Sequence, residues 1–159
     1  MARSRKDQRH RARESALQIL YQWEVGRIDV SRAADTYFEL QWPDEAAPEP
    51  ALRRFASDLA RDTVTRLDAI DALIAATAEH WRPERMALID RLILRMAACE
   101  MLRNAATPPA VVINEALELA KTFSSEESVK FINGMLDTIR KKIESGEKLA
   151  TTEDTEDTE

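Results

Sequence analysis

Residues 113–137 read INEALELAKTFSSEESVKFINGMLD, and this stretch predicts two amphipathic helices joined by a short polar turn. Apolar residues recur every three or four positions on both sides of the turn, as in a helix with one buried face. They are Val112, Ile113, Ala116, Leu117 and Ala120 before the turn, and Val129, Ile132, Leu136, Ile139 and Ile143 after it. Ser124 and Glu127 have the spacing of a capping box, which predicts that the second helix begins there. Gly134 costs that helix about 1 kcal/mol, so we expect another helix to pass close to it.

Outward from this stretch, the same helical period covers most of the chain, and proline and glycine mark its breaks. The expected helices span 9–25, stopped by Gly26, then 31–40, then Leu52 to Ile74 with a division near Leu67, and 84–103 with Pro83 in its first turn. The interval 41–50 holds three prolines and is predicted to be a loop. No segment alternates apolar and polar residues, so the predicted fold class is all-α, with the broad apolar stripe of 84–103 at the centre of the bundle.

Length and composition fit one soluble domain. The chain has 159 residues, of which 44% are hydrophobic and 33% charged. No apolar run reaches the roughly 18 to 20 residues that span a bilayer, and no signal-peptide pattern is present, so we expect a cytoplasmic protein without membrane contact. One cysteine, Cys99, and two histidines offer neither a disulfide nor a metal-ligand cluster, and Cys99 is read as a small core residue. No glycine-rich phosphate loop or catalytic set is visible, so we expect neither an enzyme nor a cofactor.

Charge is distributed unevenly along the chain. Six basic residues and one acid lie in the first thirteen positions, although the formal net charge of the whole chain is -6. A basic segment on an acidic protein predicts local docking of a polyanion. Residues 146–159 are acidic and lack large apolar side chains apart from Leu149, which predicts a disordered tail. We therefore divide the chain into a flexible basic arm (1–8), a helical domain (9–145) and this tail, which is either simply solvated or an intramolecular screen of the basic head.

Two sets of side chains suit nucleic acid. Arg9 and Arg13 are four residues apart and so share a helix face, from which both can reach phosphates. Phe123 and Phe131 flank a turn that also carries Lys130, a combination that can stack unpaired bases and hold a phosphate. For Phe131 alone, a core position is the favoured interpretation.

Three segments carry a specific resemblance. The stretch at 113–137 resembles the signature of the NusB family of bacterial transcription antitermination factors. RHRARESALQILYQWE (9–24) is similar to that family's arginine-rich helix, and DRLILRMAACEM (90–101) to its central helix. With the helices between them, the resemblance covers nearly the whole chain except the acidic tail.

The resemblance implies a compact fold of about seven helices in two packed subdomains. It also implies a role in which the protein and NusE, a small-subunit ribosomal protein, together bind the single-stranded boxA element of nascent RNA. Other Nus factors and RNA polymerase then join the complex, which suppresses termination, notably in ribosomal RNA operons. This role is non-catalytic and cytoplasmic.

Site residues follow from the matching positions. The implied RNA-binding residues are Arg9, His10, Arg11, Arg13, Tyr21, Phe123, Lys130 and Phe131. The implied NusE-binding residues are Glu84, Asp90, Arg95 and Glu127. We expect the combined change Arg9→Ala and Arg13→Ala to weaken RNA binding while leaving the melting temperature nearly unchanged.

Three positions depart from the family pattern, and two other roles stay open. Ser124 stands where glycine is frequent, Cys99 where a bulkier aromatic is common, and His10 where arginine is usual. The same fold occurs as an RNA-binding module of RNA cytosine methyltransferases, which is one alternative. A self-associating protein-interaction module, such as a homodimer, is the other.

Overall fold

Seven α-helices and one π-helical turn make up the described part of the computed structural model. It describes the backbone of residues 5–77, 85–103 and 107–157, and the side chains of 7–77, 85–103 and 107–145. The elements are α1 (Arg5–Gly26), α2 (Val30–Thr36), the π-turn η1 (Tyr37–Gln41), α3 (Pro50–Thr65), α4 (Leu67–Thr77), α5 (Leu88–Leu102), α6 (Pro109–Phe123) and α7 (Glu126–Asp157). These residues contain no strand, and the all-α fold class is confirmed.

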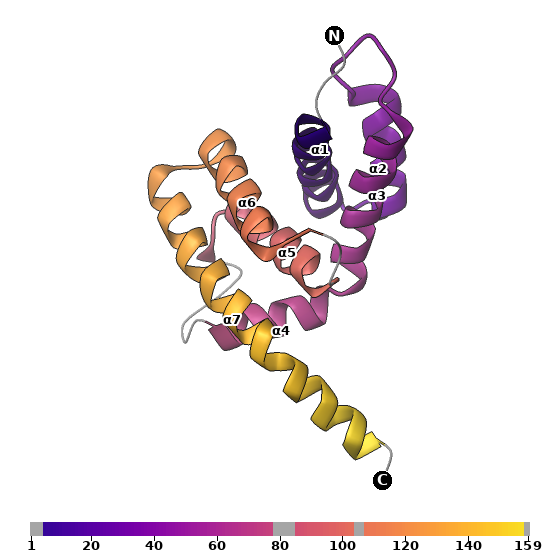
Figure 1. The fold of residues 1–159 in the computed structure, drawn as a ribbon. Helices are drawn as coiled ribbons and strands as arrows, with labels where there is room; N and C mark the ends of the chain where they lie inside the picture. Colours follow the sequence, from indigo (N-terminus) through magenta and orange to yellow (C-terminus); the bar gives the residue numbers. More distant parts are fainter. Residues whose placement is uncertain (1–4, 78–84, 104–106, 158–159) are drawn as a thin grey trace.

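The helices form two packed groups that meet along α5. Figure 1 shows α1, α2 and α3 together on one side and α4 to α7 on the other. In the first group α1 packs along α3, and in the second α6 and α7 pack against each other and against α5. Because α5 also contacts α1, α3 and α4, it joins the two groups. The two predicted subdomains are thus present.

The helix α5 is buried over nearly its whole circumference, as its broad apolar stripe predicts. Leu92, Ile93 and Leu94 are consecutive, so their side chains point to different sides of the helix, and all three are fully buried. Each such aliphatic side chain contributes about 1.5–3 kcal/mol through removal from water. Cys99 is buried on the same helix, as expected for a small core residue.

Several helix limits confirm the sequence analysis. The long stripe from Leu52 to Ile74 is divided at Arg66, between α3 and α4. Irregular backbone separates Gln41 from Pro50 where three prolines predict a loop. The helix α6 starts at Pro109, a limit that the sequence analysis did not specify. Proline is tolerated there because the first N–H of a helix has no partner within the helix.

Other limits differ from the prediction. The helix α5 begins at Leu88, later than expected, and Pro83 lies outside the described residues. The helix α1 begins at Arg5, and the left-handed residue at its end is Arg27 (φ 52°), one position after Gly26. The predicted helix 31–40 starts as α2 and widens into the π-turn η1.

The turn between α6 and α7 corrects two further expectations. Ser125, rather than Ser124, caps α7, because its Oγ accepts a hydrogen bond from the Ser128 N–H at 3.1 Å. A Cβ added to Gly134 would meet no neighbouring atom within 4 Å, so none of the described helices passes close to that glycine. The helical backbone of α7 continues past residue 146 to Asp157, whereas we expect a separate tail from 146. The domain boundaries at 8 and 145 stay predictions.

Candidate nucleic-acid interface

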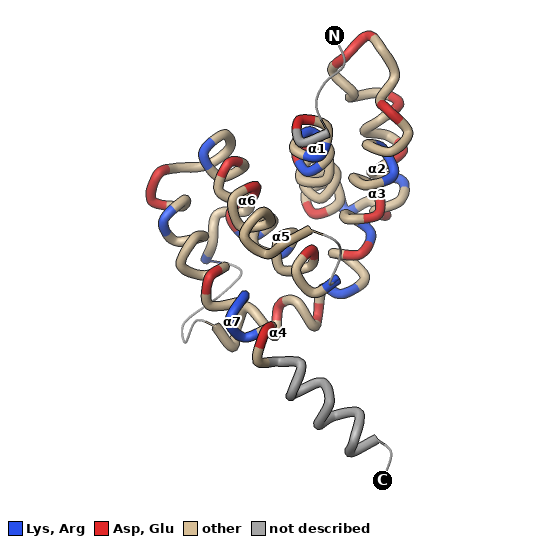
Figure 2. The backbone as a smooth tube through the Cα atoms, in the orientation of Figure 1, with Lys and Arg blue, Asp and Glu red and all other residues tan. Residues whose placement is uncertain are grey.

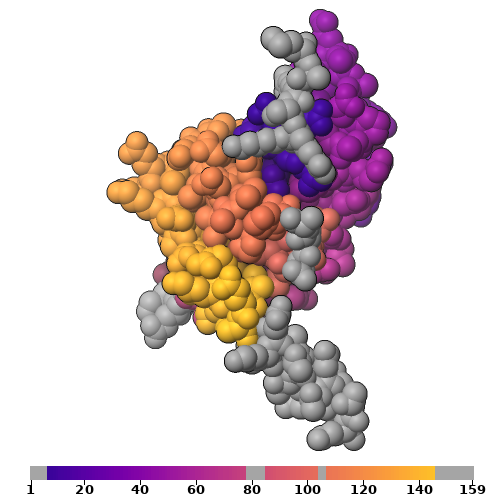
Figure 3. Space-filling view, viewed as in Figure 1, coloured from indigo at the N-terminus to yellow at the C-terminus, as the bar shows by residue number. Residues whose placement is uncertain are grey.

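Two partly exposed arginines of α1 stack on aromatic rings contributed by other elements. The guanidinium carbon of Arg9 lies 4.3 Å from the ring centroid of Phe55 on α3. That of Arg11 lies 4.5 Å from the ring of Trp42, in the loop before α3. Stacking leaves the edges of a guanidinium, which carry its N–H donors, pointing away from the ring. Both arginines are half-buried rather than covered, and Figure 3 shows part of this half of α1 (indigo) at the surface beside α6.

Arg13 also lies over the Phe55 ring, with its guanidinium carbon 5.2 Å from the ring centroid, but it is buried in the core. It is 4% exposed, and its Nε and Nη2 donate to the two carboxylate oxygens of Glu100 on α5, at 2.9 and 2.5 Å. A bidentate pair of this kind compensates the two charges for the water contacts that they lose on burial. Arg13 is therefore a link between α1 and α5 and not part of the surface on which we expected it.

His10 is also held by carboxylates. Its Nδ1 lies 2.7 Å from Glu115 on α6, and its Nε2 lies 2.8 Å from Glu14, one turn further along α1. Two carboxylates at these positions can accept from both N–H groups of an imidazolium. Together with a carboxylate beside Arg11, these contacts offset much of the charge of residues 9–13, and Figure 2 shows acidic and basic residues interspersed over the helices.

An aromatic pocket lies where α1, α5 and the end of α6 meet. It has a volume of about 110 Å³ and is lined by Leu17, Gln18, Tyr21, Ile89 and Phe123. The Tyr21 ring is 37% exposed. The structure thus brings together two predicted RNA-binding residues, Tyr21 and Phe123, that are far apart in the sequence. Such a rim can stack an unpaired base.

Asp90 holds the turn that follows Phe123. Its carboxylate is 7% exposed and accepts hydrogen bonds from Ser124 Oγ and Ser128 Oγ, both at 2.6 Å. The serine at 124, where the family frequently has glycine, therefore has a structural use in this chain. Asp90 positions the turn and does not offer a free carboxylate to a partner.

The exposed face of α7 carries the remaining predicted residues of this region. Glu127, Lys130 and Phe131 are all exposed, and the Phe131 side chain keeps 44% of its surface in water. The expectation that Phe131 belongs to the core is wrong. An exposed phenylalanine beside a lysine supports the binding role considered for both.

Arg95 was expected to face a partner but is buried in an ion-pair network. It is 6% exposed, and its Nε and Nη2 each lie 2.9 Å from a carboxylate oxygen of Asp71 on α4. Glu24 of α1 accepts a hydrogen bond from Arg91 at 3.0 Å and lies 3.9 Å from Arg95. The network joins α1, α4 and α5. Glu84 lies outside the described residues.

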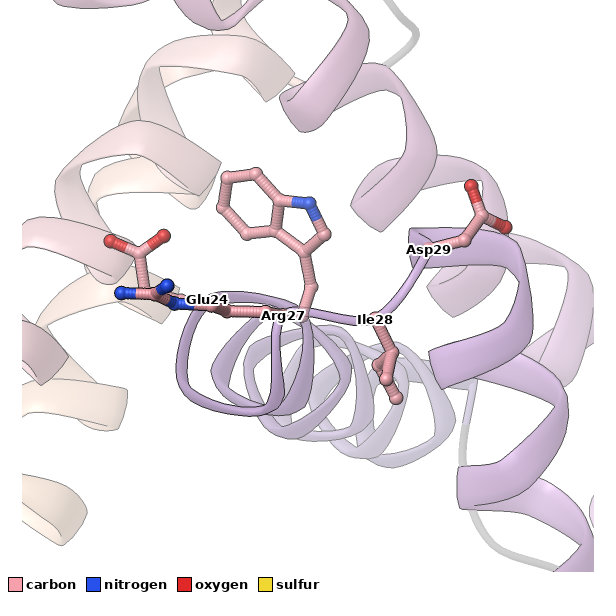
Figure 4. A pocket seen from close by; sticks show the side chains of 5 residues that line it. Glu24, Arg27, Ile28 and Asp29 are labelled. Atoms are coloured by element: carbon pink, nitrogen blue, oxygen red, sulfur yellow. The ribbon is translucent and has the colours of Figure 1, made fainter.

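A second cavity opens beside this network, at the turn from α1 to α2. It has a volume of about 540 Å³ and is lined by Trp23, Glu24, Arg27, Ile28 and Asp29. Figure 4 shows Glu24 and Arg27 on one side of the turn and Asp29 on the other, with Ile28 between them. The Asp29 carboxylate accepts from two backbone N–H groups and so caps α2. Polar lining of this kind indicates a solvated cleft.

Sequence reasoning missed the residues that hold the arginines in place. Phe55, Trp42 and Asp44 lie 31 to 46 positions after the arginines that they contact, in a different helix or in a loop. No local pattern connects them with α1. The described residues contain no group of three or more histidine, cysteine or acidic side chains able to hold a metal ion. Nor does any described helix combine the length and apolar character needed to cross a membrane.

The fold and these surfaces define a small all-helical domain that carries partly exposed arginines and aromatic rings suited to binding. Residues 10–141 match the model of the NusB family. The chain therefore belongs to the NusB family of transcription antitermination proteins.

Individual relatives agree with this assignment. The transcription antitermination protein NusB of Solibacter usitatus is 47% identical over 135 residues, which are 85% of this chain and 90% of that protein. The solved structure of T. maritima NusB is 32% identical, with a TM-score of 0.75 over 84% of this chain and 90% of that one. A solved complex of NusB and NusE with double-stranded RNA contains a chain that is 23% identical. Its TM-score is 0.71 over 85% of this chain and 97% of its own length, a likeness in fold.

Proposed function

We propose that the protein acts in transcription antitermination by binding a boxA-type single-stranded RNA together with NusE. Its family membership supports the process, and the observations that carry the RNA contact are the two partly exposed arginines stacked on aromatic rings and the aromatic pocket between α1, α5 and α6. The protein works by recognition, without a cofactor or a catalysed reaction, in the cytoplasm. Other Nus factors and RNA polymerase join the assembled complex.

Phosphates and bases are bound by different residues. Arg9 and Arg11 bind phosphates, because the aromatic rings on which they stack hold them at the surface. Lys130 of α7 binds a further phosphate. Tyr21 and Phe123 stack a base at their pocket, and Phe131 offers a second ring. Arg13 and His10 keep α1 in place through Glu100 and Glu115 and are positioning residues.

For NusE, Glu127 is the predicted contact that the structure leaves at the surface. Asp90 and Arg95 act on this contact indirectly, because Asp90 fixes the start of α7 and Arg95 fixes α5 against α4. The complex of NusB and NusE with RNA, to which this fold is similar, supports the choice of partner.

The test is a binding assay with a boxA single strand, a scrambled strand and a duplex, each with and without NusE. Preference for the boxA strand, increased by NusE, is the expected result. Equal binding of all three RNAs would contradict the proposed specificity, and preference for the duplex would contradict single-strand recognition.

Two variants separate phosphate from base contacts. With three phosphates neutralised, log affinity should fall against log salt with a slope of about -2. Arg9→Ala should make the slope shallower by about 0.7, whereas Tyr21→Ala should cost about 1–3 kcal/mol of binding free energy at an unchanged slope. Arg66→Ala, an exposed arginine at the α3–α4 junction, is the control and should change neither value.

A further inference from the structure

The loop between η1 and α3 is folded into a fixed shape against α1. The Trp42 ring packs against Phe38 and Tyr37, with ring centroids 5.7 and 6.4 Å apart. Its Nε1 donates a hydrogen bond to the carbonyl oxygen of Ala46 at 3.0 Å, which closes the loop on itself. The face of this ring carries the guanidinium of Arg11. Trp42 thus orients Arg11 without the help of a negatively charged group.

The same loop also supplies an anion to Arg11. Asp44 Oδ2 lies 2.8 Å from Arg11 Nη1, and the two side chains are 39% and 20% exposed. A carboxylate oxygen at this distance occupies a donor that an RNA phosphate oxygen would otherwise accept from. Both groups remain in contact with water, so the pair can open without leaving a buried charge unpaired.

The other carboxylates that face α1 are less able to exchange. The side chains of Arg13 and Glu100 are 5% and 3% exposed, so no phosphate reaches that pair. Glu115, beside His10, has a side chain that is 9% exposed. Among the contacts that residues 10–13 make with carboxylates of other elements, the pair at Arg11 is the most accessible to a competing anion. The His10–Glu14 pair within α1 is similarly exposed, at 29% and 37%.

We propose that Asp44 occupies the phosphate-binding edge of Arg11, and that RNA binds by exchanging this carboxylate for one of its own phosphates. This inference rests on the proposed RNA-binding function. Asp44 then sets the affinity for RNA and its salt dependence, while Trp42 keeps Arg11 in position before and after the exchange. Because Asp44 competes for Arg11, an anion that cannot displace this carboxylate does not bind Arg11.

The change Asp44→Asn tests the exchange because asparagine keeps the shape and the acceptor oxygen but removes the charge. Affinity for the boxA single strand should rise about two- to fivefold, the range expected from a partly exposed ion pair. The salt slope should become steeper by up to about 0.7, as one more uncompensated charge meets the RNA. Asp44→Ser should act in the same direction, and both variants should keep the melting temperature of the parent protein.

Two further variants make the test specific. Asp68→Asn removes one negative charge from the exposed surface of α4, at the other end of the molecule from this loop, and should leave affinity nearly unchanged. In an Arg11→Gln background, Asp44→Asn should no longer raise affinity. If Asp44→Asn instead matches Asp68→Asn, or acts equally without Arg11, the exchange is wrong while RNA binding itself stands. If the parent protein binds no single strand, the proposed function fails as well.

Discussion

Arg13 lies in the basic segment of residues 1–13, but its side chain is buried in the core. This burial reverses our expectation that its replacement leaves stability unchanged. The change Arg13→Ala leaves Glu100 buried without its cation, which destabilises a protein by about 3–5 kcal/mol. We now expect a large fall in the free energy of unfolding, measured by urea denaturation, instead of an unchanged melting temperature.

The comparison that isolates the charge is the double change Arg13→Met and Glu100→Leu, which removes both ions and keeps apolar volume. This double change should lower the free energy of unfolding by less than Arg13→Ala or Glu100→Ala alone. Arg9→Ala, on the same helix but half-buried over Phe55, should cost about 1 kcal/mol or less. An Arg13→Ala protein as stable as the parent would show that the pair contributes nothing.

Cys99 provides a second prediction at the scale of one side chain. Burial raises the pKa of its thiol above the ordinary value, against a weaker opposing effect of a hydrogen bond with Thr63. Thiolate is the reactive form, so native Cys99 should react with a disulfide reagent more than about a hundredfold slower than in the unfolded chain. The difference should widen as pH rises toward 9, because the unfolded thiol ionises there while the folded one stays protonated.

The control for this rate is an exposed cysteine in the same fold. Val25 is 55% exposed near the end of α1, so the double variant Cys99→Ser and Val25→Cys should react at nearly the rate of an unfolded chain. Native Cys99 reacting as fast as this variant would mean that the surrounding helices open readily.

Single residues show what could be predicted from the sequence and what could not. Tyr21, a candidate from the family motifs, keeps an exposed ring, whereas Phe131 is exposed although a core position was the favoured interpretation. The burial of Arg13 could not be predicted, because Glu100 lies 87 residues away and no local pattern connects the two. A helix-face argument gives the direction of a side chain relative to its neighbours on the same helix, not the element that it meets.

At the scale of one element, α7 contains a glycine that its surroundings do not require. Gly134 lies in helical backbone on the exposed face, and a Cβ there would have open space. Gly134→Ala should therefore stabilise the protein by about 0.5–1 kcal/mol, since alanine loses less backbone entropy in a helix. Thermal unfolding measures the change.

The reciprocal substitution tests the same argument in another helix. Ala72 is exposed within α4, so Ala72→Gly should destabilise by a similar amount. If Gly134→Ala lowers stability, the space around that position is occupied in solution, for example by a second copy of the chain.

Helix limits were predictable where the chain itself enforces them. Proline fixes the start of α6, and the interruption of the apolar stripe near Leu67 marks the division of α3 from α4. The start of α5 and the cap of α7 were not. Two adjacent serines, Ser124 and Ser125, can each cap a helix, and the choice is made by Asp90 of α5, which binds the Ser124 hydroxyl and leaves Ser125 as the cap.

At the scale of the whole molecule, the sequence did not show which basic residues are paired with carboxylates. The excess of basic residues near the N-terminus predicts a polyanion dock, and the structure places Glu14, Asp44, Glu100 and Glu115 against its residues 10–13. Fewer positive charges are thus available to RNA than the sequence suggests. Which of them remain available depends on packing between helices far apart in the chain.

The acidic end of the chain allows a test at the same scale. The core packing of α7 extends to Ile139 and Ile143, and the family match ends at residue 141. Removal of residues 146–159 should therefore leave the melting temperature unchanged. This segment holds six acids and one lysine, so its removal changes the formal net charge from -6 to -1.

If the segment is simply solvated, its charge acts on RNA only through long-range repulsion, which is largely screened at physiological ionic strength, where the Debye length is about 8 Å. We expect the affinity of the shortened protein for the boxA strand to change by less than about twofold at that ionic strength, and to rise further only at low salt. A large increase at physiological salt, lost again when Arg9 and Arg11 are replaced by alanine, would instead show that the segment competes with RNA for these arginines. In that case two acidic elements, this segment and Asp44, would control the same surface, and combining the truncation with Asp44→Asn should raise affinity less than the product of the two separate effects.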